Sequence, residues 1–327
     1  MNNATNFYIG LDVHSRCTQY AVRTWQGDVI SEGKTSSIYK DVKAVLEPYF
    51  HSCIVGMEAS TSIYPLHDGF SNDNVPVKVA NVIRIRELIV KNDRLDARRL
   101  SDMLRLNTFP ESFIPDKKLK QLRDIICIRH SFLQGLNAAQ SRIWALLQMK
   151  GIKIPVRRIF SKKGLEHIKL VSESSPDLKY LYQHYKNIEQ SLEQSTSEMI
   201  EYAGRNFPSE WEKLHSLDGI ADIISSYAIA YIHPMSRFSS EKKLRRYVGV
   251  IPVTQESGGK FIGCMLPKHS SRALLRWAFT QAAHCAIRKK DSKLRAYYNA
   301  RKKNKKQKAI MAVAREICDL VYYKLKE

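Results

Sequence analysis

The first 58 residues combine a strand pattern with acidic residues at places where strands seldom carry them. Three β-prone segments, residues 7–13, 17–25 and 29–34, follow one another closely. Such spacing predicts three antiparallel strands joined by hairpins. Asp12 lies inside the first segment, where a charge is costly unless it is paired or bound to a metal ion. The chain is therefore expected to begin with a sheet that carries an acidic site.

The next segment alternates helices with strands. We expect a helix over 37–50, a strand over 53–57, a short helix over 65–70, a strand over 75–80 and a helix over 83–90. Three antiparallel strands followed by alternating β and α elements are the layout of an RNase H-like α/β domain. In such a sheet the first and fourth strands are neighbours, so Asp12 and Glu58 would face each other. The alternative is that Asp12 is a turn residue and Glu58 a cap.

A second acidic pair follows in the stretch from Lys91 to Arg99. Asp93 and Asp96 are three residues apart, so a helix would place them on one face about one turn apart. Their mutual repulsion becomes attraction if they share a divalent cation, and Mg²⁺ prefers hard oxygen ligands of this kind. The alternative is a solvated helix face of mixed charge. The flanking cations that could contact phosphate are Arg94, Arg98 and Arg99.

Taken together, Asp12, Glu58, Asp93 and Asp96 predict a carboxylate site for Mg²⁺ or Mn²⁺. Two-metal phosphoryl-transfer chemistry requires a cluster of this kind. The charge of the chain points to the same substrate class. Lysine and arginine number 53 against 32 acids, a formal net charge of +21, which favours binding to a polyanion.

Nucleic acid is the first candidate for that polyanion, and an anionic membrane surface is the second. No apolar run approaches the ~20 residues of a spanning helix, and the first residues lack the apolar region of a signal peptide, so no membrane partner is expected. The six cysteines are scattered without a CxxC pair, which is typical of thiols in a reducing compartment. We expect a cytoplasmic protein.

Three short motifs resemble those of a known family. Ile9-Gly10-Leu11-Asp12-Val13, Met57-Glu58-Ala59-Ser60 and Asp93-Arg94-Leu95-Asp96-Ala97-Arg98 resemble the DEDD transposases of the insertion-sequence one-ten family, which includes the pilin-gene invertases. The resemblance implies a RuvC-like N-terminal domain whose four acids hold the metal. It also implies guidance by a bridge RNA, action on donor and target DNA, a dimer that becomes a tetramer in the synaptic complex, and a place in the bacterial cytoplasm at the nucleoid.

The middle of the chain is helical. Residues 107–115 contain two prolines and are expected to be a linker, while apolar residues recur at helical spacing over 117–149 and 177–202. With the basic loop 153–169 between them, they predict a helical coiled-coil hairpin. The resemblance implies that this hairpin serves dimer contacts and RNA binding; the alternative is an ordinary antiparallel pair. The expected domains are 1–108, 109–206 and 207–327.

The last third is expected to be mainly α. The turn around Gly219 between two helical segments resembles a helix-hairpin-helix, whose backbone amides can hold a phosphate. Many relatives have a glycine where Ala221 stands. Further on, Thr254-Gln255-Glu256-Ser257-Gly258-Gly259-Lys260 would by chemistry alone be a flexible turn. The resemblance implies that Ser257 is the family's proposed nucleophile, with the segment Leu275-Arg276-Trp277-Ala278 at the matching distance.

The glycines after Ser257 would give a bulky phosphodiester room to approach. Ser270 and Ser271 are weaker candidates, expected instead to cap the helix over 272–288. Relatives often have an arginine where Ile262 stands, so other cations are expected to hold phosphate. A basic run over residues 301–308 is expected to contact the nucleic-acid backbone. The cations expected to do so in this third of the chain are Lys260, Lys268, Arg272, Arg276, Lys302, Lys303, Lys305 and Lys306.

Three functions remain open on these grounds. The first is a recombinase in which Ser257 forms a phosphoserine bond while metal ions polarise the phosphate. The second is a RuvC-type, metal-dependent junction nuclease in which water attacks. The third is a non-catalytic nucleic-acid-binding protein whose acids are structural. A covalent protein–DNA adduct separates the first from the second, and convergence of the four acids on one metal excludes the third.

Overall fold

The computed structural model describes residues 5–81, 93–257, 260–265, 270–302 and 305–327, with the backbone alone for 93–95, 253–257, 260–265 and 270–272. The chain divides into two compact units, residues 1–114 and 115–327. This division comes later than the boundary expected after residue 108. Residues 109–112 lie along the edge of the N-terminal sheet, where Ser112 N donates to Val79 O at 2.7 Å.

The N-terminal unit contains a five-stranded sheet. Its strands are β1 (Phe7–Val13), β2 (Cys17–Thr24), β3 (Val29–Ser36), β4 (Cys53–Glu58) and β5 (Val77–Ala80), in the order β3-β2-β1-β4-β5. The first three strands pair antiparallel, whereas β4 runs parallel to both β1 and β5. The predicted adjacency of the first and fourth strands is confirmed. This mixed sheet is consistent with the RNase H-like prediction.

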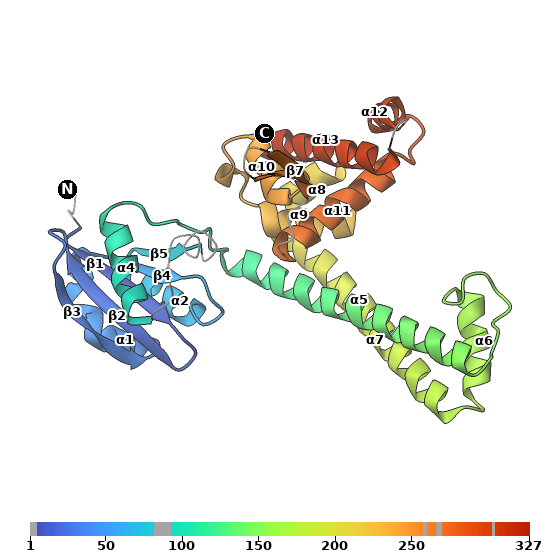
Figure 1. Ribbon diagram of the computed structural model, residues 1–327, viewed down its shortest axis with the longest axis horizontal. Coiled ribbons are helices and arrows are strands. Elements are labelled where there is room, and N and C mark those ends of the chain that lie inside the picture. Colours follow the sequence, from blue (N-terminus) through green and yellow to red (C-terminus); the bar gives the residue numbers. More distant parts are fainter. Residues whose placement is uncertain (1–4, 82–92, 258–259, 266–269, 303–304) are drawn as a thin grey trace. The chain divides into compact units, whose positions relative to one another are not determined.

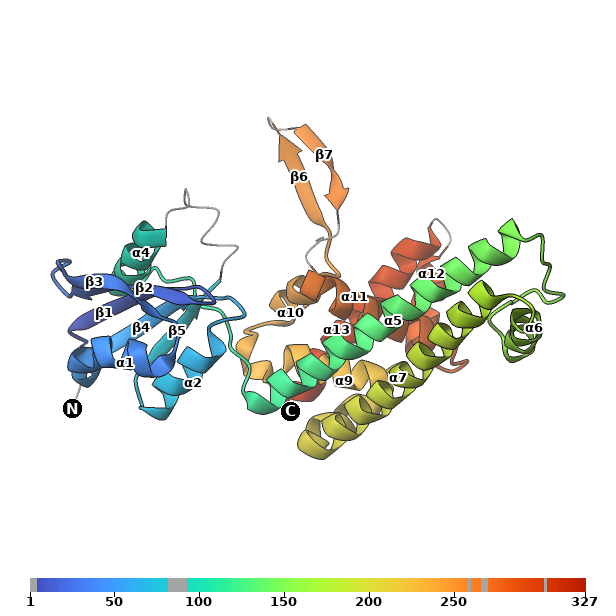
Figure 2. The same ribbon diagram turned by 90° about the horizontal axis from the view of Figure 1, so that it is seen from below.

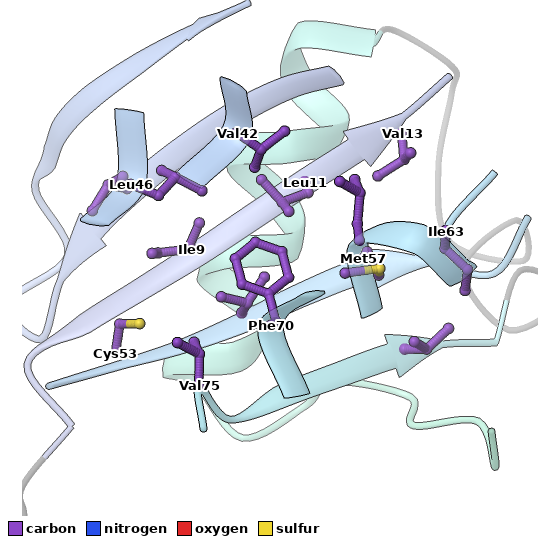
Figure 3. Close-up of a cluster of buried hydrophobic side chains, with 14 residues drawn as sticks. Ile9, Leu11, Val13, Val42, Leu46, Cys53, Met57, Ile63, Phe70 and Val75 are labelled. Atoms are coloured by element: carbon purple, nitrogen blue, oxygen red, sulfur yellow. The ribbon is translucent and has the colours of Figure 1, made fainter. Parts of the chain in front are cut away.

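Helices cover both faces of the sheet (Figure 2). On one face lie α1 (Tyr39–Leu46), the 3₁₀ helix η1 (Glu47–Ser52) and α2 (Tyr64–Asn72). The core there is built from alternate β1 residues such as Ile9 and Leu11 together with Phe70 of α2 (Figure 3). On the other face lies α4 (Asp93–Arg105). The helix expected over 83–90 falls outside the described residues.

The second unit begins with a helical hairpin. Helices α5 (Lys117–Met149) and α7 (Pro176–Asn206) run side by side, as predicted from their apolar spacing (Figure 1). Asp116 caps α5 by accepting from Leu119 N at 2.8 Å. The connecting segment, expected to be a basic loop, contains a further helix, α6 (Lys162–Ser172), because Ile168 buries itself against the two long helices.

The rest of this unit is mainly helical, as predicted. It contains α8 (Pro208–His215), α9 (Asp222–Ile232), η2 (Met235–Arg237), α10 (Glu241–Val248), α11 (Ser270–Ala286), α12 (Lys293–Arg301) and α13 (Lys306–Lys326). Strands β6 (Val253–Ser257) and β7 (Lys260–Met265) form a separate antiparallel pair between α10 and α11 in the chain (Figure 2). Among the described helices, none has the length and apolar character needed to cross a membrane.

Candidate active site

The sheet directs Asp12 and Glu58 to the same face. Leu11 pairs with Met57 across the β1–β4 ladder, and both side chains lie in the core on the α1–α2 side. Because successive strand residues point to opposite faces, Asp12 and Glu58 face the side that α4 covers. Asp12 is only 8 % exposed, so its carboxylate is held in a largely desolvated position. The predicted pairing of these two acids on neighbouring strands is therefore consistent with the register.

Two glycines bring α4 close to this face. Gly10 pairs with Gly56 across the same ladder, and each glycine lies two residues before one of the acids. A Cβ on Gly10 would lie 2.0 Å from the carbonyl oxygen of Ala97, and a Cβ on Gly56 would lie 2.8 Å from Leu104 Cδ1. No larger residue fits at Gly10 without moving the helix backbone. The missing side chain at Gly10 therefore sets how closely the α4 backbone approaches β1, while Gly56 makes room for the side chains of Leu104 and Phe109.

The buried stripe of α4 determines which end of the helix reaches the acids. Ala97, Leu100, Ser101 and Leu104 are buried against the sheet. Gly10 contacts α4 at Ala97, whereas Arg105, at the C-terminal end of α4, lies near Gly27 in the turn beside the Phe7 end of β1. The N-terminal end of α4 therefore lies toward the end of β1 that carries Asp12. Asp96 is half-buried beside Ala97. Asp93 is the first residue of α4, and its side chain lies outside the described part of the structure.

Neighbouring side chains contact Asp12, Asp96 and helix α4. His14 Nε2 lies 3.0 Å from Asp12 Oδ2, and Arg99 Nη1 lies 3.4 Å from Asp96 Oδ1. Arg98 donates from Nε and Nη2 to the two carboxylate oxygens of Glu32 on β3, at 2.5 and 2.7 Å. The hydrogen bonds to Glu32 raise the pKa of Arg98. Arg98, expected to contact nucleic acid, thus ties α4 to the sheet.

The acids have the ligand chemistry that a hard divalent cation requires, since all supply carboxylate oxygens. Within the described side chains, no three His, Cys, Asp or Glu residues form a group close enough to hold a metal ion. Asp12, Glu58 and Asp96, whose side chains are described, therefore do not form such a group by themselves, and the Asp93 side chain is outside the description. The cluster of four therefore stays a prediction.

Ser257 lies in the other unit. It is the last residue of β6, and it pairs with Lys260, the first residue of β7. The register of the pair shifts between Gln255 and Glu256, which marks a bulge just before the serine. Its side chain is outside the description, so its role as nucleophile remains a prediction. Ser257 thus ends a strand, while Gly258 and Gly259, where the sequence predicts a flexible turn, lie outside the described residues.

Two family models match the chain. Residues 9–150 match the model of a DEDD transposase, and residues 211–299 match one described as "Transposase IS116/IS110/IS902 family". The first match contains Asp12, Glu58, Asp93 and Asp96, and the second contains Ser257. The chain belongs to the IS110 family of transposases. The family predicted from the three short motifs is thereby confirmed.

Curated relatives agree at low identity. A Sinorhizobium fredii protein described as transposase y4qE is 22% identical over 246 residues, which cover 72% of this chain and 58% of that protein. The transposase for insertion sequence element IS1111A of Coxiella burnetii is 21% identical over 245 residues, covering 68% of this chain and 66% of that protein. The match thus spans under two thirds of the length of each relative.

The glycine turn of the family's second matched region is packed rather than open. Gly219 has a φ of +88°, and a Cβ there would lie 2.3 Å from the carbonyl oxygen of Ala282 on α11. Lys289 Nζ donates to Asp218 Oδ1 at 2.6 Å, and this bond lowers the pKa of Asp218. The side of the turn at Gly219 therefore faces α11, which gives this glycine a packing role.

The cations expected to contact nucleic acid fall into three groups. Arg98 and Arg99 are engaged with Glu32 and Asp96 on the N-terminal unit. Lys302, Lys305 and Lys306 are exposed between α12 and α13, whereas Arg276 on α11 is half-buried. Lys268 and Lys303, together with the side chains of Arg94, Lys260 and Arg272, lie outside the described part.

Three residues that position the site were not identified from the sequence. Gly10 and Gly56 fix the approach of α4, and the available signal was glycine in the interior of two β-prone segments, which marks a place where another backbone comes close. Arg23 of β2 was also missed: its Nη2 donates to the carbonyl oxygen of Arg98 on α4 at 3.5 Å. Nothing local in the sequence marks that contact.

Proposed function

We propose that this chain is a DNA transposase that cuts and rejoins DNA strands, with Asp12, Glu58, Asp93 and Asp96 at its metal-dependent centre and Ser257 as its nucleophile. The observation that carries the proposal is the register of β1 and β4, which directs Asp12 and Glu58 to the face on which α4 packs at Gly10. Membership of the IS110 family supports the substrate class, DNA. The net charge of +21 supports it as well.

The four acids would hold Mg²⁺ or Mn²⁺ ions, which supply Lewis-acid activation of a phosphodiester when bound. The protein's own contribution is positional. The glycine pair seats α4 on the sheet, and the Arg98–Glu32 pair fixes its rotation. Arg99, which contacts Asp96, offsets part of the negative charge of the site, and the His14 ring hydrogen-bonds to Asp12.

The strand-transfer step needs no external oxidant or reductant. Ser257 Oγ attacks the phosphorus of the scissile phosphodiester, a new O–P bond forms, and the bond to one sugar oxygen breaks. The serine proton leaves for a nearby carboxylate or water, and the departing sugar oxygen takes up a proton. Attack of another strand's hydroxyl on the phosphoserine reverses the exchange and releases the serine, so the energy of the phosphodiester is conserved.

The metal acids and Ser257 belong to different units of the chain. We therefore infer a composite site assembled when DNA binds, with the Ser257 strand pair supplied by the same chain or by a partner copy. A bridge RNA that pairs with donor and target DNA would explain how one protein selects two DNA sites. A dimer, and a tetramer in the synaptic complex, would hold the four strand ends.

The test uses a DNA substrate that carries a nick near the cleavage point. First, the protein is purified from its host and any RNA that copurifies is sequenced, which supplies the guide. Protein, RNA, Mg²⁺ and nicked DNA are then mixed and denatured. The wild type should leave a protein–DNA adduct that survives denaturation, and Ser257→Ala should leave none.

Ser271→Ala is the matched control, because Ser271 lies in the first turn of α11, which begins at Ser270 and not at residue 272 as predicted. It should retain the adduct. An adduct in Ser257→Ala would place the nucleophile elsewhere. Cleavage by the wild type without any adduct would instead favour the junction nuclease, and binding without cleavage would favour the non-catalytic protein.

A further inference from the structure

A groove in the second unit lies between three helices. Residues of α5, α9 and α11 line it, and its volume is about 720 Å³. Sites for small organic groups commonly measure about 300–1,000 Å³. The groove lies within residues 115–327, the unit that also carries Ser257. Among the described side chains, Asp12, Glu58 and Asp96 do not line it, so the groove is distinct from these acids of the proposed metal centre.

Aromatic rings form one wall of the groove. Trp277 of α11 lies against Tyr227 of α9, with ring centroids 5.7 Å apart, yet 38% of Trp277 remains exposed. Tyr231, one turn further along α9, is 8% exposed, and the guanidinium carbon of Arg123 lies 5.3 Å from its ring centroid. A fixed indole with an exposed surface is a stacking platform for planar groups.

Helix α5 contributes the polar side chains that line the groove. His130 and Gln134 lie four residues apart on α5 and so share one face of that helix. The Gln134 amide can both donate and accept hydrogen bonds, as the edge of a nucleobase requires. Arg123 is anchored by donating from Nε to the carbonyl oxygen of Ala230 at 2.7 Å. Among the described residues that line the groove, none is Asp or Glu.

We propose that this groove binds an unpaired base of the DNA strand on which the chain acts. The base would stack on Trp277, present its edge to His130 and Gln134, and leave its phosphate beside Arg123. The positive charge of Arg123 suits a polyanion, and the aromatic rings of the groove suit a planar group. The proposal rests on the proposed function, because exchanging strands requires that bases at the junction separate from their partners.

The experiment measures binding of the full chain to two labelled DNA duplexes of equal length. One is fully paired, and the other has a three-nucleotide single-stranded gap that contains 2-aminopurine. The wild type should bind the gapped DNA about tenfold more tightly, since stacking of one base on an aromatic side chain gives an effect of that size. Stacking in the groove should also quench the 2-aminopurine fluorescence.

Trp277→Ala should reduce the ratio of the two affinities to about one, and Trp277→Phe should keep most of it. Trp144→Ala is the matched control, because Trp144 is also an exposed tryptophan on this unit, at 49%, and does not line the groove. Gln134→Glu adds a carboxylate at an exposed position and should lower the ratio with little effect on folding. If Trp277→Ala does not fold, Gln134→Glu decides.

An unchanged ratio in both groove variants overturns the proposal, as does a wild type with no preference for the gap. A change in sedimentation mass in Trp277→Ala without a change in the ratio would show a contact between copies of the chain instead. An RNA of the same sequence that competes far better than DNA would overturn the assignment to DNA. If the wild type binds neither duplex, the proposed DNA transposase function fails. If it binds both duplexes equally, only the groove proposal fails.

Discussion

Gly10 and Gly56 face each other across the β1–β4 ladder, beneath helix α4. Each lies two residues before an acid of the candidate site, Asp12 on one strand and Glu58 on the other. The same backbone that points the acids toward α4 also removes the side chains that would hold the helix away. Packing of the helix and geometry of the site are therefore set by one pair of residues.

Gly10→Ala is expected to destabilise the protein and to reduce strand cleavage together. The new Cβ would lie 2.0 Å from Ala97 O and 2.6 Å from Ser101 N, which are backbone atoms that cannot rotate away. Overpacking of this kind costs about 1–3 kcal/mol or more. Denaturant unfolding and a cleavage assay check both effects.

Gly135→Ala on α5 is the matched control. Its Cβ would meet Ile188 Cδ1 at 3.5 Å, an ordinary contact, and replacing a glycine inside a helix gains about 0.5–1 kcal/mol. This variant should unfold at a higher denaturant concentration with cleavage unchanged. Equal stability of Gly10→Ala and the wild type would show that α4 is not seated by the glycines.

The Arg98–Glu32 pair should behave as one structural unit. A double-mutant cycle with Arg98→Ala and Glu32→Ala is expected to give a small but measurable favourable coupling, since Arg98 is 39% exposed and solvent screens the pair. The salt dependence of DNA binding should change little. A coupling near zero with a shallower salt dependence would return Arg98 to the nucleic-acid interface expected from the sequence.

The stability of the helical hairpin should depend on pH through Asp177. Hydrogen bonds from Ser175 and then Lys150 lower the pKa of this carboxyl to about 2. Because the folded pKa lies below the ordinary value of about 4, the stabilisation is present above pH 4 and is lost as pH falls toward 2. The difference in Tm between wild type and Asp177→Asn should shrink over that range. A difference that stays constant would contradict the assignment.

Much of the N-terminal unit could be predicted because it follows from local pattern. The alternation in β1 and the acid at the end of β4 are visible in a few residues, and the strand order follows from them. The position of α4 on the sheet could not be predicted from local sequence, because Gly10 contacts Ala97 and Arg98 pairs with Glu32. Both contacts join segments more than 60 residues apart, where only the folded chain brings them together.

In the helical hairpin, too, elements that depend on distant contacts could not be predicted from local sequence. The long helices α5 and α7 follow from apolar spacing, but α6 was missed because it starts inside residues 153–169, a stretch with six lysines and arginines that was interpreted as a basic loop. Its Ile168 is buried only because two other helices provide the surface. The acids of the candidate site could be named from the sequence, whereas the groove beside Trp277 could not, since its walls come from three separate helices.

The exposed lysines between α12 and α13 are expected to contact the DNA backbone. Replacing Lys302, Lys305 and Lys306 together by Gln should make the log–log dependence of affinity on salt shallower by up to about 2.7, or about 0.9 for each duplex phosphate that a lysine no longer neutralises. Lys303 lies outside the described residues and is left unchanged. Exposed lysines elsewhere serve as the control triple: Lys40, Lys118 and Lys179. A slope that is equal in both triples would show that this segment does not approach DNA.

Asp96→Asn is expected to abolish cleavage while leaving folding and DNA binding nearly intact. The amide keeps the shape of the half-buried side chain but loses the charge that a divalent cation requires. Asp102→Asn is the control on the same helix, because Asp102 accepts from Arg105 at 2.8 Å and lies at the far end of α4 from Asp96. Measured at several Mg²⁺ concentrations, cleavage should persist in Asp102→Asn and be absent in Asp96→Asn. Full activity of Asp96→Asn would remove this residue from the metal site and leave Asp12, Glu58 and Asp93 to be tested one at a time.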